Sequence, residues 1–157
     1  MKTRMSWREK LEKKQEPKIV DIPPKMVKRF GTGKMLIPRP LDVDALIRKV
    51  KKGKLVTQAQ IRERLAKDFA VDVTCPITTG IFVRIAAEAA EEDLCEGKKL
   101  VTPYWRVMKK GGSLNPKFPG GIEAQTARLK EEGHIILVSE GKKPPHVKDF
   151  EKHLQRL

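Results

Sequence analysis

The sequence predicts a mainly helical α+β fold: a winged-helix-like helix-turn-helix domain with a minor β hairpin and a basic N-terminal arm. Two helical patterns, over about 57–68 and 77–93, are separated by a short connection. Short extended segments follow them, and the basic residues are concentrated before residue 60. We expect three segments, an arm over 1–40, the domain over 41–140 and a basic tail over 141–157.

The composition favours a polyanionic partner. The 157 residues carry 34 Lys and Arg against 20 Asp and Glu, a net charge of +14. Residues 1–60 alone hold 17 of these cations and 6 of the acids. Such a surplus indicates nucleic acid first, because an array of Lys and Arg displaces counterions from a phosphate backbone.

Membrane, secretory and metal-binding classes are not expected. No run of 18 apolar residues is present, and the first residues lack the apolar core of a secretory signal. Cys75 and Cys95, with three distant histidines, fit no zinc spacing. We therefore expect a cytoplasmic protein with no metal, no cofactor and no membrane partner.

The arm begins with a short helical pattern. Ser6 and Glu9 form a capping-box pattern, so we expect a helix over about 6–16. Residues 17–40 hold five prolines and two glycines, which break any periodicity, and are expected to be irregular.

The domain begins with helical spacing of apolar residues over about 43–50. Thr57 and Gln60 form a second capping box at the start of the 57–68 helix. Pro76 suits the first turn of the next helix, in which apolar residues from Ile81 to Ala89 recur at helical spacing. This layout is typical of a helix-turn-helix.

The second half of the domain is expected to be mixed. Residues 100–108 read as extended, 109–112 as a turn and 115–121 as a loop. A helix over about 121–133 ends at Gly133, and the segment HIILV at 134–138 reads as a strand. A short helix is expected near the C-terminus.

One segment resembles a known family. It reads Pro103-Tyr104-Trp105-Arg106-Val107, then Lys110-Gly111-Gly112-Ser113-Leu114, then Pro119-Gly120-Gly121 and a helix ending Glu131-Glu132-Gly133. Together with Gly53–Thr57 and Cys75-Pro76 upstream, it resembles the active-site domain of alkylguanine-DNA alkyltransferases, the methylated-DNA–protein cysteine methyltransferases. The resemblance covers about residues 41–133 and implies a winged-helix DNA-binding scaffold.

The departures from that family concern its chemistry. Tyr104 stands where the family has its alkyl-accepting cysteine, and Trp105 where it has the adjacent histidine. Thr126 aligns with the family's glutamate, and Gly80 with the arginine that fills the gap left by a flipped base. The resemblance therefore implies an alkyltransferase-like protein without catalytic residues. Such proteins bind alkylated DNA and pass the lesion to other repair proteins.

The residues that could form a site fall into two groups. Tyr104, Trp105 and Arg106 are candidates for a base pocket, since aromatic faces stack on extruded bases. The other interpretation is that the two rings fill the space left by the missing chemistry and that Arg106 hydrogen-bonds to backbone carbonyls. The candidates for contacts with double-stranded DNA are Thr57, Thr78, Thr79, Arg84, Lys51, Lys52, Lys54, Lys109 and Lys110.

Two further features are interpreted as structural. Cys75 lies near a helix N-terminus but has no histidine near it in sequence, so it is not expected to be a nucleophile. The acidic run Glu88, Glu91, Glu92 and Asp93 is expected to form a solvated face that repels phosphate.

Three functions remain open at this point. The favoured one is non-enzymatic DNA binding, with sensing of alkylated or flipped bases. One alternative is an active alkyl transferase that uses an unrecognised acceptor. The other is a basic protein that associates with RNA or the ribosome.

Overall fold

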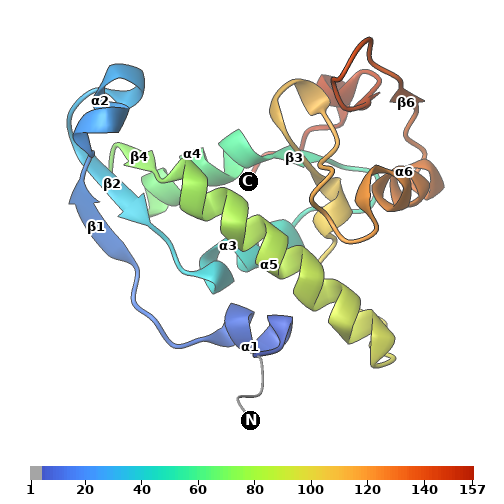
Figure 1. Ribbon diagram of the computed structural model, residues 1–157, viewed down its shortest axis with the longest axis horizontal. Helices are drawn as coiled ribbons and strands as arrows, with labels where there is room; N and C mark the ends of the chain where they lie inside the picture. Colours follow the sequence, from blue (N-terminus) through green and yellow to red (C-terminus); the bar gives the residue numbers. More distant parts are fainter. Residues whose placement is uncertain (1–4) are drawn as a thin grey trace.

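A computed structural model describes residues 5–157 of the chain. Six helices and three small sheets form the described part of the chain, which confirms the predicted mainly helical α+β class (Figure 1). The helices are α1 (Trp7–Glu12), α2 (Pro24–Phe30), α3 (Pro40–Arg48), α4 (Gln58–Asp68), α5 (Pro76–Cys95) and α6 (Gly121–Glu131). The strands are β1 (Lys18–Asp21), β2 (Lys34–Ile37), β3 (Val56–Thr57), β4 (Val73–Thr74), β5 (Val107–Met108), β6 (Ile136–Leu137) and β7 (His146–Val147). No helix in residues 5–157 is long and apolar enough to cross a membrane.

The helix-turn-helix consists of α4 and α5. The Thr57 hydroxyl accepts from the Gln60 amide at 3.1 Å, and the Gln60 side chain accepts from the Thr57 amide at 2.9 Å, so the predicted capping box is present. Pro76 occupies the first turn of α5, as expected. α5 crosses the molecule between the β1–β2–β4 sheet and the region of α6 and β6 (Figure 1).

The expectation of an irregular stretch over 17–40 is wrong. β1 pairs antiparallel with β2, and β2 pairs parallel with β4 in the helix-turn-helix connection. α2 fills the turn between the two strands, with Pro24 in its first turn. The prolines lie between these elements or at helix starts. The paired residues of β2 and β4, such as Met35 and Val73, lie 38 positions apart, so local periodicity gave no sign of the sheet.

Residues before position 40 contribute to the main core. Leu11 of α1 and Leu36 of β2 are fully buried in the same cluster as Ile47, Ile61 and Val83. The division of the chain at residues 40 and 140 stays a prediction, but both sides of the first boundary pack together. α1 is also shorter than the expected 6–16 helix, because Lys13 already leaves helical geometry.

The C-terminal part agrees with the predictions in outline. β6 lies in the expected 134–138 strand and pairs antiparallel with β7, with Ile136 opposite Val147, and β7 falls in the segment that was expected to be a basic tail. The segment 100–108 is only partly extended, since residues 104–106 form a 3-10 turn before β5 pairs in parallel with β3. The expected C-terminal helix is a 3-10 turn at Phe150–His153, and the chain after it bonds to Leu55.

Candidate nucleic-acid interface

A groove runs between the first half of α5 and the loop over residues 109–117. It has a volume of ≈ 320 Å³ and is lined by Gln58, Ile77, Gly80, Ile81, Arg84, Lys109, Asn115 and Lys117. Three of the lining residues are cations and none is a carboxylate. Such a lining presents a positive potential to an anionic ligand.

The helix α5 places one face in the core and the other in this groove. Thr79 and Val83 are fully buried, whereas Ile77 and Ile81 are 57% and 53% exposed. The Thr79 hydroxyl donates to the Cys75 carbonyl at 2.7 Å. The prediction that Thr79 contacts DNA is therefore wrong.

Only two of the other predicted DNA-binding residues line the groove. Arg84 and Lys109 line it directly, and Thr57 caps α4 one residue before Gln58. The Thr78 hydroxyl donates to the buried Cys75 sulfur at 3.0 Å. The remaining predicted cations are exposed but do not line the groove, namely Lys51, Lys52, Lys54 and Lys110.

Sequence reasoning missed several lining residues. Ile77 and Ile81 lie four positions apart on the outward face, but apolar spacing alone does not tell which face of a helix is inward. Lys117 and Asn115 lie in a loop whose course over α5 is a tertiary feature. The cluster of cations in the loop segment KKGGSLNPK was the one available signal.

Tyr104, the first base-pocket candidate, is a core residue here. Its side chain is 1% exposed, and its hydroxyl donates to the Glu91 carboxylate at 2.6 Å. Its ring meets the rings of Trp105 and Phe118 edge to face, at centroid distances of 5.3 and 5.2 Å. Burial, followed by the bond to Glu91, raises the pKa of Tyr104 well above its ordinary value. The phenol is therefore neutral and is a poor nucleophile.

The neighbouring candidates are also occupied within the protein. The Arg128 guanidinium lies 4.5 Å from the Trp105 ring centroid and pairs with Glu91 at 3.0 Å. Arg106 donates to both Glu132 oxygens, at 2.9 and 2.6 Å, and to the Val50 carbonyl at 2.6 Å. In this closed arrangement the prediction of a base pocket is wrong. The alternative interpretation, filled space and a carbonyl bond from Arg106, agrees with these contacts.

The Arg106–Glu132 pair fixes the loop around these rings. Burial opposes ionisation of Glu132, but the hydrogen bonds and the charge of Arg106 outweigh it and hold the pKa of Glu132 below its ordinary value. Gln125, buried on α6, donates to the Trp105 carbonyl at 3.1 Å and accepts from the Asn115 amide at 2.8 Å. Gln125 thereby ties the groove loop to the Tyr104 segment.

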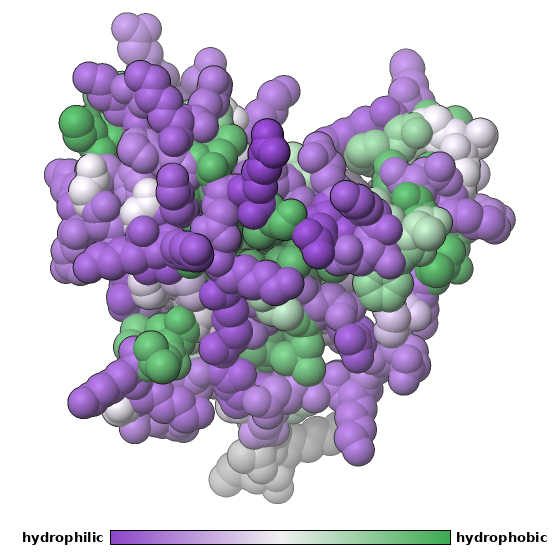
Figure 2. Space-filling model, turned by 180° about the vertical axis from the view of Figure 1, so that it is seen from behind, coloured by the Kyte–Doolittle hydropathy of each residue, from purple (hydrophilic) through white to green (hydrophobic). Residues whose placement is uncertain are grey.

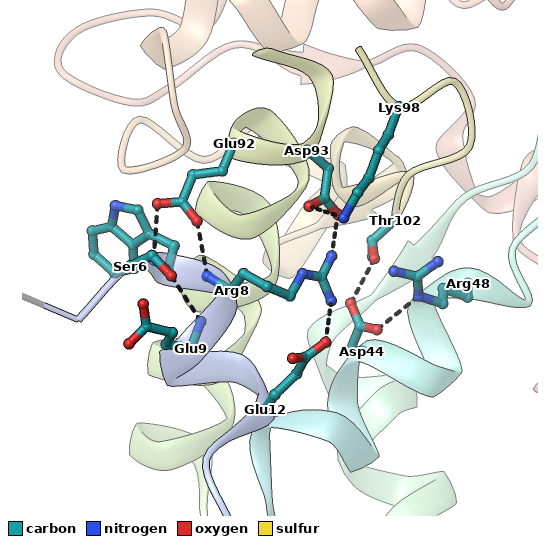
Figure 3. A network of polar contacts seen from close by, with 11 residues as sticks. Ser6, Arg8, Glu9, Glu12, Asp44, Arg48, Glu92, Asp93, Lys98 and Thr102 are labelled. Carbon is teal, nitrogen blue, oxygen red and sulfur yellow. Dashed lines mark hydrogen bonds and ion pairs between the residues drawn. The ribbon is translucent and has the colours of Figure 1, made fainter. Parts of the chain in front are cut away.

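The acidic second half of α5 is not the expected solvated face. The two Glu92 oxygens accept from the backbone amides of Trp7 and Arg8, each at 2.9 Å (Figure 3). Asp93, 2% exposed, accepts from the side chains of Arg8 and Lys98. Burial opposes ionisation of Asp93, but these two bonds outweigh it and hold its pKa below the ordinary value. The acids therefore bind α1 to α5.

A second buried acid supports the same junction. Asp44 of α3 accepts from the Thr102 hydroxyl at 2.6 Å and from Arg48 at 2.8 Å, beside the Arg8 cluster (Figure 3).

Seen from behind, the molecule is covered mainly by hydrophilic side chains, with separate apolar patches (Figure 2).

The fold has a counterpart among solved structures. No family model and no curated protein matches the chain. The chain is similar to the crystal structure of S. pombe Atl1 in complex with damaged DNA containing O6-carboxymethylguanine. The TM-score is 0.51 at 16% identity, over 75% of this chain and 94% of the other. This likeness supports the helix-turn-helix fold that the alkyltransferase resemblance implied.

Proposed function

We propose that the protein binds double-stranded DNA through the groove between α5 and residues 109–117, without catalysing a reaction. The observation that carries the proposal is the lining of this groove, with three cations and no carboxylate on the exposed face of the second helix of a helix-turn-helix. The structure of S. pombe Atl1, a fold relative, was solved with damaged DNA. We place this activity in the cytoplasm, alongside other repair proteins.

The burial of Tyr104 and Cys75 supports DNA binding without alkyl transfer. Tyr104 is neutral, enclosed and bonded to Glu91, so it offers no reactive oxygen. Cys75 is buried at the start of α5 and accepts a bond from Thr78. The closed packing around Tyr104 further favours DNA bound without a base inserted into the protein, rather than sensing of a flipped alkylguanine.

A salt titration tests the phosphate contacts. Binding to a labelled 20-base-pair duplex is followed by fluorescence anisotropy for the wild type and for Lys109→Ala/Lys117→Ala. Each lost phosphate contact lowers the magnitude of the log–log salt slope by about 0.9, so the double variant should lose about 2. The matched control is Lys13→Ala/Lys99→Ala, two exposed lysines at the ends of α1 and α5 away from the groove.

The proposal fails if both double variants lose the same slope, since binding would then follow net charge alone. It also fails if a structured RNA of equal charge displaces the duplex at a much lower concentration. Truncation of residues 1–40 is not a usable test, because it removes Leu11 and Leu36 from the core.

A further inference from the structure

Two large apolar side chains stand in the middle of this positive groove. Ile77 and Ile81 lie one helical turn apart on the exposed face of α5 and form what we call the isoleucine ridge. Each is more than half exposed, whereas Thr79 and Val83 on the opposite face of the same helix are fully buried. Between them lies Gly80, whose lack of a side chain leaves both isoleucines prominent.

The charges around the ridge point to the kind of partner. Arg84, Lys109 and Lys117 line the same groove, and no carboxylate does. An apolar protein partner does not account for a rim of cations, whereas nucleic acid offers phosphates at its edges and apolar base faces between them. The charge complementarity therefore favours a duplex as the occupant.

The chemistry of the ridge then limits how it can contact that duplex. Ile77, Gly80 and Ile81 carry no side-chain donor or acceptor, so they cannot read the hydrogen-bond pattern of base edges. Apolar side chains such as isoleucine do act on DNA as wedges that partly unstack a base step and kink the duplex. Such a contact is cheaper where stacking is already weak.

We propose that the isoleucine ridge presses between neighbouring base pairs as an apolar wedge, so that the protein prefers DNA that unstacks easily. This inference rests on the proposed function, since the flanking cations must hold the duplex in the groove. It assigns Ile77 and Ile81 as specificity-determining residues for distorted DNA, independently of any base pocket at Tyr104.

The test compares two duplexes that differ in one central mismatch, at fixed salt. We expect the wild type to prefer the mismatched duplex by about tenfold, equivalent to about 1.4 kcal/mol. Ile77→Ala/Ile81→Ala should lose most of this preference and keep the salt slope, because every cation remains. Ile81→Leu should keep the preference. The matched control is Ile19→Ala on β1, where an isoleucine is also 53% exposed.

Three results would overturn the wedge. If the wild type and the double alanine variant prefer the mismatched duplex equally, the ridge does not unstack the base step. The salt titration of Lys109→Ala/Lys117→Ala can still support groove binding in that case. A loss of affinity when every thymine is replaced by uracil shows that the isoleucines contact thymine methyl groups in the major groove instead. No binding of either duplex overturns the wedge and the proposed function together.

Discussion

The two halves of α5 differ in what surrounds their side chains. The first half presents Ile77, Ile81 and Arg84 to an open groove lined by cations. The second half carries Glu92 and Asp93, whose oxygens are bonded to α1 and to Lys98. One continuous helix therefore lines an open cationic groove at one end and is an internal attachment site at the other.

The charged side chains of α5 have different roles that depend on their bonding partners. The acids of the second half were expected to repel phosphate from a solvated face, yet most of their oxygens are used inside the protein. Arg84 lies at the junction, with its guanidinium 4.0 Å from Glu88 and 5.8 Å from the Trp7 ring centroid. In the first half, the exposed face carries Ile77 and Ile81, which do not contribute to the buried core.

The largest effect is expected where the second half holds α1. Asp93→Ala removes the buried carboxylate that pairs with the partly buried Arg8 guanidinium. Removing one partner of a buried ion pair lowers the free energy of unfolding by about 3–5 kcal/mol. Chemical denaturation should therefore show a large loss in the free energy of unfolding. DNA affinity below the unfolding transition should change less than about twofold, because the groove lies at the other end of α5.

The matched control uses the same arginine. Glu12 also pairs with Arg8, but its side chain is 59% exposed. Exposed pairs contribute less than about 1 kcal/mol, so Glu12→Ala should cost little. Equal losses in the two variants would mean that burial does not distinguish these pairs and that Asp93 is no special attachment point for α1.

A smaller effect is expected at the bond between Tyr104 and the second half. Tyr104→Phe removes the hydroxyl that donates to Glu91, while Arg128 still pairs with that carboxylate. The free energy of unfolding should fall by about 1–2 kcal/mol. The ratio of affinities for duplexes with and without one alkylguanine should stay the same.

A large change in that ratio would contradict the assignment of Tyr104 to the core. It would show that the cluster opens in solution and that the hydroxyl contacts an inserted base. Mass spectrometry after incubation with alkylguanine DNA provides an independent check, since alkyl transfer would increase the mass of the protein.

The sequence predicted the elements whose signals are local. The Thr57–Gln60 capping box and Pro76 located both helices of the helix-turn-helix, and the charge distribution indicated a polyanion. It did not reveal the β1–β2–β4 sheet, because the pairing of β2 with β4 joins residues far apart in the chain. Residues 17–40 were predicted to be irregular because they hold five prolines, but these prolines lie outside the strands.

The site was predicted less completely than the fold, for a related reason. Arg84 and Lys109 were recognised by charge, but the ridge was not, since an isoleucine on α5 reads as core until the packing is known. Tyr104 was recognised through its place in the alkyltransferase pattern. The partner that encloses it, Glu91, lies 13 residues away and was taken for a solvent-facing acid.

The smallest effect is expected at Glu88, where the two halves meet. Burial raises the pKa of Glu88 above the usual 4.5, so the ionised carboxylate is less stable in the folded chain than in the unfolded one. For an acid with a raised folded pKa, this penalty is complete above the folded pKa and disappears as the pH falls below 4.5. Glu88→Gln should therefore raise the free energy of unfolding slightly at pH 7, by under about 1 kcal/mol, and have no stabilising effect near pH 4. Urea denaturation of both proteins at each pH measures the difference, with the exposed Glu63→Gln as the control. A loss of stability at pH 7 would show that the 4.0 Å pair with Arg84 outweighs burial, and that the acidic half of α5 restrains the arginine of the groove.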